Sequence, residues 1–129
     1  MANQFVVELK NEPGGLATLA EALAERGIDL RAIGGGGIGD TGHIIMTTAD
    51  DDAARAVLEA GSYTFIEGES ILTEVDDRPG GMARLSRALA DAGVNIYGHL
   101  FLGRWGDRAM FAFVVDDPDR ARPILERKG

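Results

Sequence analysis

The residues best placed to do chemistry form two short turns of the same kind, Asn11–Leu16 and Asp77–Met82, which read NEPGGL and DRPGGM. Each proline favours an extended residue before it, and the paired glycines permit a tight reversal with free backbone N–H groups. N–H groups at the start of a helix attract an anion such as a carboxylate, and a side-chain amide or carboxylate accepts a hydrogen bond from an ammonium. The turns therefore predict binding of a small molecule that carries both groups.

These turns belong to an internal repeat. The segment LATLAEALAERGIDL after the first turn matches MARLSRALADAGVNI after the second without a gap, at an offset of 66 residues. The same register extends to Asp50–Asp51 against Asp116–Asp117, and then to Leu58 against Ile124. Two copies at this period indicate a tandem of two small modules. A half of about 60 residues buries little surface by itself, so the two modules are expected to share an interface.

The first module has the element order strand, helix, strand, strand, helix, strand, which is the order of a ferredoxin-like βαββαβ fold. The apolar spacing predicts strands at 4–10, 28–33, 43–48 and 62–67, helices at 16–26 and 50–60, and a glycine-rich connection at 34–42. Gly27 is expected to end the first helix as a left-handed cap. The predicted fold class is α+β, with two such modules, 1–68 and 69–129, packed side by side.

The second module repeats this order but lacks an obvious final strand. Its expected elements are strands at 70–75, 94–102 and 108–115, a helix at 82–92 capped by Gly93, a turn at 103–107, and a helix opening at Asp117-Pro118. Pro123 stands where the ungapped repeat places Val57, so the last helix is expected to be short, kinked or interrupted. Two alternatives stay open: a three-stranded second sheet, or a strand at 63–66 that serves one module at the expense of the other.

Composition excludes several classes of function. The chain of 129 residues has 13 Lys plus Arg against 21 Asp plus Glu, a net charge of −8, so a nucleic-acid partner is not expected. The absence of cysteine excludes disulfides and thiolate metal sites, and the only histidines, His43 and His99, make no metal site by themselves. Catalytic residues and cofactors are not expected. The N-terminus has no basic segment, and no apolar run reaches membrane-spanning length, so we expect a cytoplasmic protein that does not enter a membrane.

The motif Asn/Asp-x-Pro-Gly-x-Leu/Met after a strand, followed by a Leu-rich helix and Gly-Ile/Val-Asp/Asn-Leu/Ile, resembles the ACT domain. This family comprises small ligand-binding regulatory modules attached to many enzymes of amino-acid metabolism. The resemblance covers nearly the whole chain, and it implies a small ligand, most often an amino acid, held where two modules meet. It thus implies a standalone sensor or regulatory subunit without chemistry of its own, with an enzyme of amino-acid metabolism as a possible partner.

The resemblance also implies which residues bind. The polar positions are Asn11 and Asp77 before the turns, and Asp29 and Asn95 at the start of the second strands. Backbone N–H groups would come from Gly14, Gly15, Leu16, Gly80, Gly81 and Met82. If the modules are related by a pseudo-twofold axis, Asn11 faces Asn95 and Asp77 faces Asp29. The neutral pair suits a zwitterion, whereas two carboxylates disfavour a ligand carboxylate, so we expect one productive site, the first. All four polar residues are also common turn and cap formers.

Three further features have competing interpretations. Gly34–Gly39 contains G-x-G-x-x-G, but a strand follows instead of a helix, so a mobile hairpin loop or lid is expected. His99 alternates with Asn95 and Tyr97 and is a candidate ligand contact or a structural residue. Aromatic side chains gather in one hairpin, at Tyr97, Phe101, Trp105, Phe111 and Phe113. If helices cover the opposite face, these side chains form a homodimer surface; otherwise they are ordinary core.

The alternative to a ligand sensor is a dimerisation or docking module, and a small enzyme is the least favoured class.

Overall fold

The computed structural model describes residues 2–126, which form two compact units divided between Gly68 and Glu69. Unit 1 contains β1 (Asn3–Lys10), α1 (Gly15–Glu25), β2 (Leu30–Ile38), β3 (Thr41–Thr48), α2 (Asp51–Ala60) and β4 (Phe65–Glu69). Unit 2 contains β5 (Ile71–Asp76), α3 (Gly81–Asp91), β6 (Ile96–Trp105), β7 (Arg108–Val115) and α4 (Pro118–Leu125). The predicted fold class, α+β with two antiparallel sheets, is confirmed. Side-by-side packing of the modules stays a prediction.

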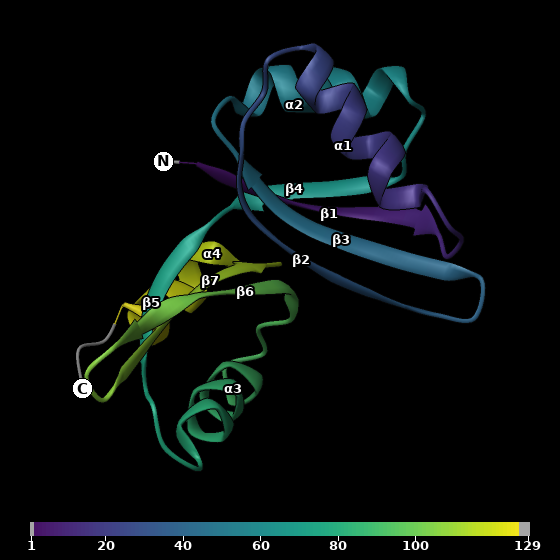
Figure 1. Ribbon diagram of the computed structural model, residues 1–129. Coiled ribbons are helices and arrows are strands. Elements are labelled where there is room, and N and C mark those ends of the chain that lie inside the picture. Colours follow the sequence, from purple (N-terminus) through teal and green to yellow (C-terminus); the bar gives the residue numbers. More distant parts are fainter. Residues whose placement is uncertain (1, 127–129) are drawn as a thin grey trace. The chain divides into compact units, whose positions relative to one another are not determined.

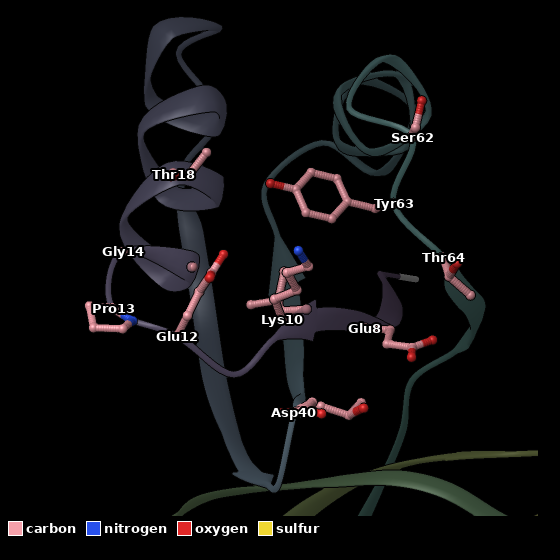
Figure 2. A pocket seen from close by; sticks show the side chains of 13 residues that line it. Glu8, Lys10, Glu12, Pro13, Gly14, Thr18, Asp40, Ser62, Tyr63 and Thr64 are labelled. Carbon is pink, nitrogen blue, oxygen red and sulfur yellow. The ribbon is translucent and has the colours of Figure 1, made fainter.

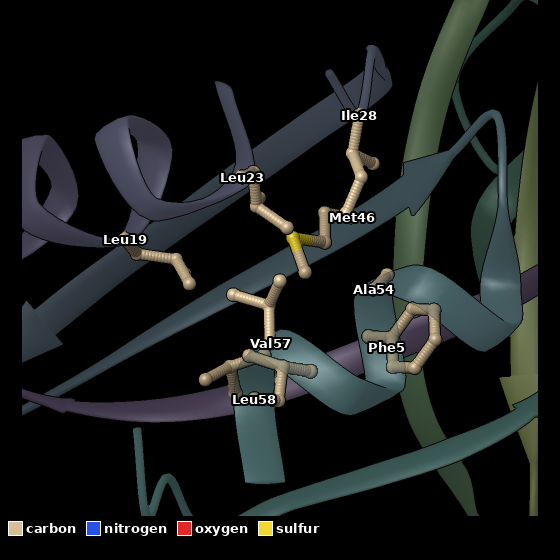
Figure 3. Close-up of a cluster of buried hydrophobic side chains, with 9 residues drawn as sticks. Phe5, Leu19, Leu23, Ile28, Met46, Ala54, Val57 and Leu58 are labelled. Atoms are coloured by element: carbon tan, nitrogen blue, oxygen red, sulfur yellow. The ribbon is translucent and has the colours of Figure 1, made fainter. Parts of the chain in front are cut away.

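Unit 1 is a four-stranded sheet in the order β2-β3-β1-β4, and Figure 1 shows α1 and α2 covering the same face of it. The core lies between that face and the helices (Figure 3). Phe5 and Met46 are opposite one another in β1 and β3, and both are fully buried against Leu23 and Leu58. The first strand, first helix and second helix therefore each contribute the apolar positions that their spacing predicts.

Unit 2 is a three-stranded sheet in the order β5-β7-β6. Its core joins Leu89 of α3 and Leu125 of α4 to Ile71 and Phe113 of the sheet. Within residues 2–126, unit 2 has no counterpart of β4, which itself lies next to β1 in the first sheet. Both alternatives therefore apply: the strand near Tyr63 belongs to the sheet of unit 1, and unit 2 has a three-stranded sheet.

The glycine-rich segment was expected to be a mobile connection, and this expectation is wrong. Gly34 to Gly37 belong to β2 and pair with β3, with Gly35 opposite Ile44 and Gly37 opposite Gly42. The reversal occurs only at Gly39 and Asp40. Because glycine keeps both backbone hydrogen-bonding groups, a glycine run can continue a ladder that β3 already templates. No lid is formed by this segment.

The ungapped alignment of the two repeats is wrong for every residue after the bulge in β6. The helix caps are Asp50 in unit 1 and Asp117 in unit 2, whose side chains accept from Ala53 N and Arg120 N, so the offset has become 67. The extra residue lies in a bulge of β6 between Phe101 and Gly103. A bulge adds one residue without ending the ladder.

With the corrected offset, Leu125 corresponds to Leu58, and both are fully buried. Pro123 therefore corresponds to Ala56 and not to Val57. It lies on the exposed side of α4, which is short, as predicted. The left-handed caps at Gly27 (φ 68°) and Gly93 (φ 76°) are also confirmed.

The predicted homodimer surface required Phe111 and Phe113 to lie on the face of the sheet that no helix covers. This placement of the two side chains is wrong. In the corrected register they occupy the places of Ile44 and Met46, and Phe113 is buried in the core against α3 and α4. Three aromatic side chains of the hairpin are still exposed, Tyr97, Phe101 and Trp105.

Candidate functional site

The first glycine of each Pro-Gly-Gly turn has a left-handed backbone conformation. Gly14 has a φ of 90° and precedes α1 without any side-chain cap, and Gly80 has a φ of 91° before α3. Residues other than glycine rarely adopt this backbone conformation. The turns therefore place two uncapped helix starts, where the positive end of the helix dipole is open to a ligand.

The N–H groups at these starts are only partly free. Gly15 N donates to Glu12 O at 3.3 Å and Gly81 N to Arg78 O at 3.1 Å, so the expectation that these two glycines offer free N–H groups is wrong. The first bond inside α1 is Thr18 N to Gly14 O at 2.9 Å. Among the described residues, the N–H groups of Leu16 and Ala17 have no acceptor, and Met82 and Ala83 are in the same position in unit 2.

Asn11 holds the β2–β3 hairpin against the turn. Its backbone N–H donates to Asp40 O at 2.9 Å, and its side-chain Nδ2 donates to Gly39 O at 3.0 Å. A Cβ added to Gly37 would lie 2.7 Å from Asn11 Oδ1, so the amide packs directly over that glycine. Oδ1 receives no hydrogen bond from the rest of residues 2–126, which leaves it available as an acceptor.

Beside the start of α1 lies a cavity of about 450 Å³, here called the glycine pocket because Gly34 to Gly37 of β2 line it. Its apolar walls come from β1, α1, β2 and β3, and Asn11 and Gly15 lie at its polar end. A volume of this size is typical of small-molecule sites. The apolar wall residues are Leu9, Leu16, Ile33 and Ile44.

The corresponding place in unit 2 is partly filled by the chain's own side chains. Arg104 Nε donates to Asp77 Oδ2 at 2.8 Å, and its guanidinium lies 4.7 Å from the centre of the Phe101 ring. The Phe101 ring meets that of Phe111 edge-on, with the ring centres 5.5 Å apart. These side chains leave a smaller cavity of about 360 Å³, lined by Asp77, Met82 and Arg104 among others, which is the counterpart of the glycine pocket.

The other predicted site residues lie at the start of the second strand of each unit or farther along it. Asp29 Oδ2 is 3.5 Å from Arg31 Nε, and both side chains are exposed. Asn95 N donates to Asp116 Oδ1 at 2.9 Å, while the exposed His99 ring lies 6.3 Å from that of Phe113. Pairing of Asn11 with Asn95 and of Asp77 with Asp29 stays a prediction. Because Arg31 and Arg104 partner the two aspartates, carboxylate repulsion is a weaker reason for a single productive site than the sequence indicated.

Unit 1 has a second cavity, of about 500 Å³, between α1 and the loop that precedes β4. Figure 2 shows Lys10 and Tyr63 directed into it, with the carboxylates of Glu8, Glu12 and Asp40 around them. Within residues 2–126, Lys10 has no carboxylate at ion-pair distance. Three carboxylates to one ammonium make this cavity unfavourable for a ligand carboxylate. The glycine pocket is therefore the stronger candidate site.

No group of three or more His, Asp or Glu side chains in the described part of the chain is arranged to hold a metal ion. No helix among residues 2–126 is long and apolar enough to cross a membrane.

The sequence profile of the ACT domain matches residues 4–60, which include the Asn11 turn, α1, the glycine strand and most of α2. Residues 4–60 are thus similar to the ACT domain. The match comprises nearly all of unit 1, so the glycine pocket lies within the matched residues. No protein with a curated description matches the sequence at a significant level.

Solved structures share the fold over both units. A protein from Bacteroides thetaiotaomicron is 22% identical with a TM-score of 0.71, over 97% of this chain and 86% of that one. The ligand-free regulatory subunit of aspartate kinase from Thermus thermophilus is 22% identical with a TM-score of 0.63, over 97% and 87%. The regulatory subunit of aspartate kinase from Thermus flavus is 21% identical with a TM-score of 0.64, over 97% and 90%.

Sequence reasoning missed the apolar half of the glycine pocket. Ile33 and Ile44 were assigned only to strands, and the glycines between them to a loop. The available signal was the position of the glycines between two apolar strand segments, where a run without side chains leaves room on a sheet face.

Proposed function

We propose that this protein is a regulatory, non-catalytic subunit that binds a small amino acid in the glycine pocket of its ACT domain. One observation carries the proposal: an uncapped helix start and an unused amide oxygen border the same pocket. The N–H group of Leu16 and the Oδ1 atom of Asn11 are the groups concerned, and the N–H group of Ala17 follows at the same helix start.

These groups complement the two charges of an amino acid. The α-carboxylate accepts from the N–H groups at the start of α1, where the helix dipole favours a negative charge. The α-ammonium donates to Asn11 Oδ1. The apolar walls receive the ligand side chain, which gives the pocket a polar end and an apolar end, as is usual for small-molecule sites.

Binding regulates by shifting a conformational equilibrium toward the form that holds the ligand better. Two structural neighbours are regulatory subunits of aspartate kinase. By analogy, we expect this chain to act on a partner enzyme of amino-acid metabolism, in the cytoplasm, and as a homodimer. Contributions from the second unit through Asn95, and the single productive site expected from sequence, are part of this proposal.

The experiment is thermal unfolding of the full chain with each of the twenty amino acids, followed by calorimetric titration of those that stabilise it. A ligand at about 100 times its dissociation constant stabilises the folded state by roughly 2.7 kcal/mol, which for a chain of this size is a shift of several degrees. A panel without any shift contradicts the proposal.

Two variants locate the site. In Asn11→Ala the stabilisation should be lost, and the melting temperature without ligand shows whether the variant is folded. In Tyr63→Phe, which removes only a hydroxyl from the second cavity, the stabilisation should remain. The reverse result would move the site to the cavity of Figure 2.

The alternative function is a dimerisation or docking module without a ligand. Its support is the exposure of Tyr97 (47%), Phe101 (48%) and Trp105 (61%) in the β6–β7 hairpin. Exposed aromatic groups of this kind are enriched in protein interfaces. Sedimentation equilibrium of the chain and of Trp105→Ser tests it: a dimer that dissociates in the variant, with no response to amino acids, favours this alternative.

A further inference from the structure

The two units differ most sharply at one position of their second strands. In unit 1, Gly35 of β2 is opposite Ile44 of β3; in unit 2, Phe101 of β6 is opposite Phe111 of β7. The corrected register makes these pairs equivalent. Residues that are directly opposite in an antiparallel pair lie on the same face of the sheet. Phe101 therefore stands in unit 2 at the strand position where unit 1 has no side chain.

Phe101 does not act alone. Beyond the bulge, Arg104 is opposite Ala109 as Gly37 is opposite Gly42, so a second glycine of unit 1 is replaced by a long cationic side chain. The arginine binds Asp77, the counterpart of Asn11, and covers the Phe101 ring. A cation on the turn residue and an aromatic ring on the strand thus narrow the cavity of unit 2 to about 360 Å³.

Unit 1 cannot fill its own pocket in this way. A Cβ on Gly35 would lie 2.3 Å from the backbone oxygen of His43, and one on Gly37 would lie 2.7 Å from Asn11 Oδ1. Side chains at these positions would collide with groups that hold the hairpin. The pocket consequently stays open, with Ile33, Ile44 and Leu16 as an apolar wall and Asn11 at the polar end.

We infer that the amino acid bound by unit 1 has a large apolar side chain, aromatic above all, and that Arg104 with Phe101 is its internal counterpart in unit 2. The ligand side chain lies across Gly35 against Ile44, as the Phe101 ring lies against Phe111. Its ammonium binds Asn11 as the guanidinium of Arg104 binds Asp77. This inference rests on the proposed function and adds the class of ligand. It also gives a physical reason to prefer unit 1: Arg104 and Phe101 narrow the equivalent cavity of unit 2, which is about 360 Å³ against about 450 Å³ in unit 1.

The selectivity follows from what each ligand would bury. A phenylalanine or leucine side chain removes its apolar surface from water against three aliphatic walls, whereas serine leaves those walls exposed. A lysine or aspartate side chain would lose hydration against these aliphatic residues, because the charged lining residues, Lys10 and Glu12, flank Asn11 at the polar end. We expect phenylalanine to bind at least about tenfold more tightly than serine.

The test is calorimetric titration of the full chain with phenylalanine, leucine, serine, lysine and aspartate. Binding of phenylalanine and leucine with about one equivalent per chain, and at least about tenfold weaker binding of the rest, is the expected result. Equal or tighter binding of serine, lysine or aspartate, lost in Asn11→Ala, overturns the ligand class and leaves the proposed function standing. No binding by any amino acid overturns both.

Two variants test the geometry. Leu16→Trp should fill the pocket from its solvent side and abolish phenylalanine binding, and Leu16 is exposed enough (49%) for the fold to accept the change. Leu72→Trp, at an exposed position of β5 (54%), is the matched control and should bind like the wild type. Unchanged affinity in Leu16→Trp overturns the placement of the ligand.

Phe101→Ala should open unit 2 and raise the number of phenylalanine equivalents bound above that of the wild type. Phe101 is half-exposed, so we expect the variant to fold, and circular dichroism is the measurement that checks this. A folded Phe101→Ala variant without additional binding overturns the equivalence between the Phe101 ring and the ligand.

Discussion

The two units have the same turn conformation before their first helix and differ in the side chains that lie beside it. Gly14 and Gly80 have nearly the same φ, 90° and 91°, and each precedes a helix without a side-chain cap. A short distance away, one unit leaves an open pocket over glycines, and the other packs its own phenylalanine and arginine at that place. Positions that the backbone conformation dictates have stayed the same in both repeats, whereas positions that face a pocket have diverged.

The end of the first strand shows the same contrast in charge. Lys10 in unit 1 lines an open cavity, while Asp76 in unit 2 binds Arg108 and lies 3.6 Å from Arg84. These arginines stand where unit 1 has Thr41 and Thr18. The ion pairs of unit 2 therefore narrow this space, which measures about 240 Å³ there and about 500 Å³ in unit 1.

The largest expected effect comes from the two cores. Leu23 of α1 and Leu89 of α3 are both fully buried, so replacing either with alanine should reduce the free energy of unfolding by about 3 kcal/mol. Urea unfolding followed by circular dichroism reports on both units, and the fluorescence of Trp105, the sole tryptophan, reports on unit 2. A loss below about 1 kcal/mol in either variant would contradict the core assignment for that unit.

The second glycine of each turn should distinguish the units next. A Cβ on Gly81 would lie 2.2 Å from Asp76 O, whereas one on Gly15 would lie 3.1 Å from Lys10 O. Gly81→Ala should therefore cost about 2 kcal/mol through overpacking. Gly15→Ala should be nearly neutral, because the helix preference of alanine offsets a mild contact. Chemical denaturation of both variants measures the difference, and equal losses would mean that the two turns are equally tight.

Sequence was sufficient for elements defined by local chemistry. The Pro-Gly-Gly turns, the left-handed caps at Gly27 and Gly93 and the aspartate caps of the later helices follow from residue type alone. The single-residue bulge in β6 did not, because a repeat with an insertion in a strand keeps an apparent alignment while every later position shifts. That shift misplaced Phe111, Phe113 and Pro123.

The candidate site was only half predictable for a related reason. The polar residue Asn11 was identified from its turn, but its partner Gly39 belongs to a hairpin that the glycine run had concealed. Similarly, no local pattern reveals that Arg104 reaches Asp77 and covers Phe101. Such contacts depend on strand register, which is determined by pairing between segments that are distant in sequence.

The contrast in charge between Lys10 and Asp76 can be tested directly. Asp76→Asn removes the carboxylate that binds Arg108, a largely buried guanidinium with a side-chain exposure of 24%, and should lower the free energy of unfolding by about 1 kcal/mol. Lys10→Met should change it by less than about 0.5 kcal/mol, since no carboxylate of the described chain pairs with that ammonium. Thermal unfolding at low and high salt measures both, and salt should reduce only the Asp76 effect. A larger loss in Lys10→Met would reverse the comparison.

The smallest expected effect concerns the bridge that ties α2 to β4, an element found only in unit 1 among the described residues. Arg55 donates to Glu67 through Nε and an Nη atom, both at 2.6 Å, and Asn3 adds a third bond at 2.6 Å. The hydrogen bonds from Arg55 hold the pKa of the Glu67 carboxyl below its ordinary value, against the opposing effect of burial.

A carboxyl with a lower pKa in the folded chain than in the unfolded chain stabilises the fold while it is ionised. This stabilisation of unit 1 is complete above the unfolded pKa and is lost as the pH falls through the folded pKa. Urea unfolding between about pH 7 and about pH 3 should therefore show a steeper acid decline in the wild type than in Glu67→Gln, by less than about 1 kcal/mol. Parallel declines would show that the bridge contributes nothing, and that α2 is held to the sheet by Leu58 and its apolar neighbours alone.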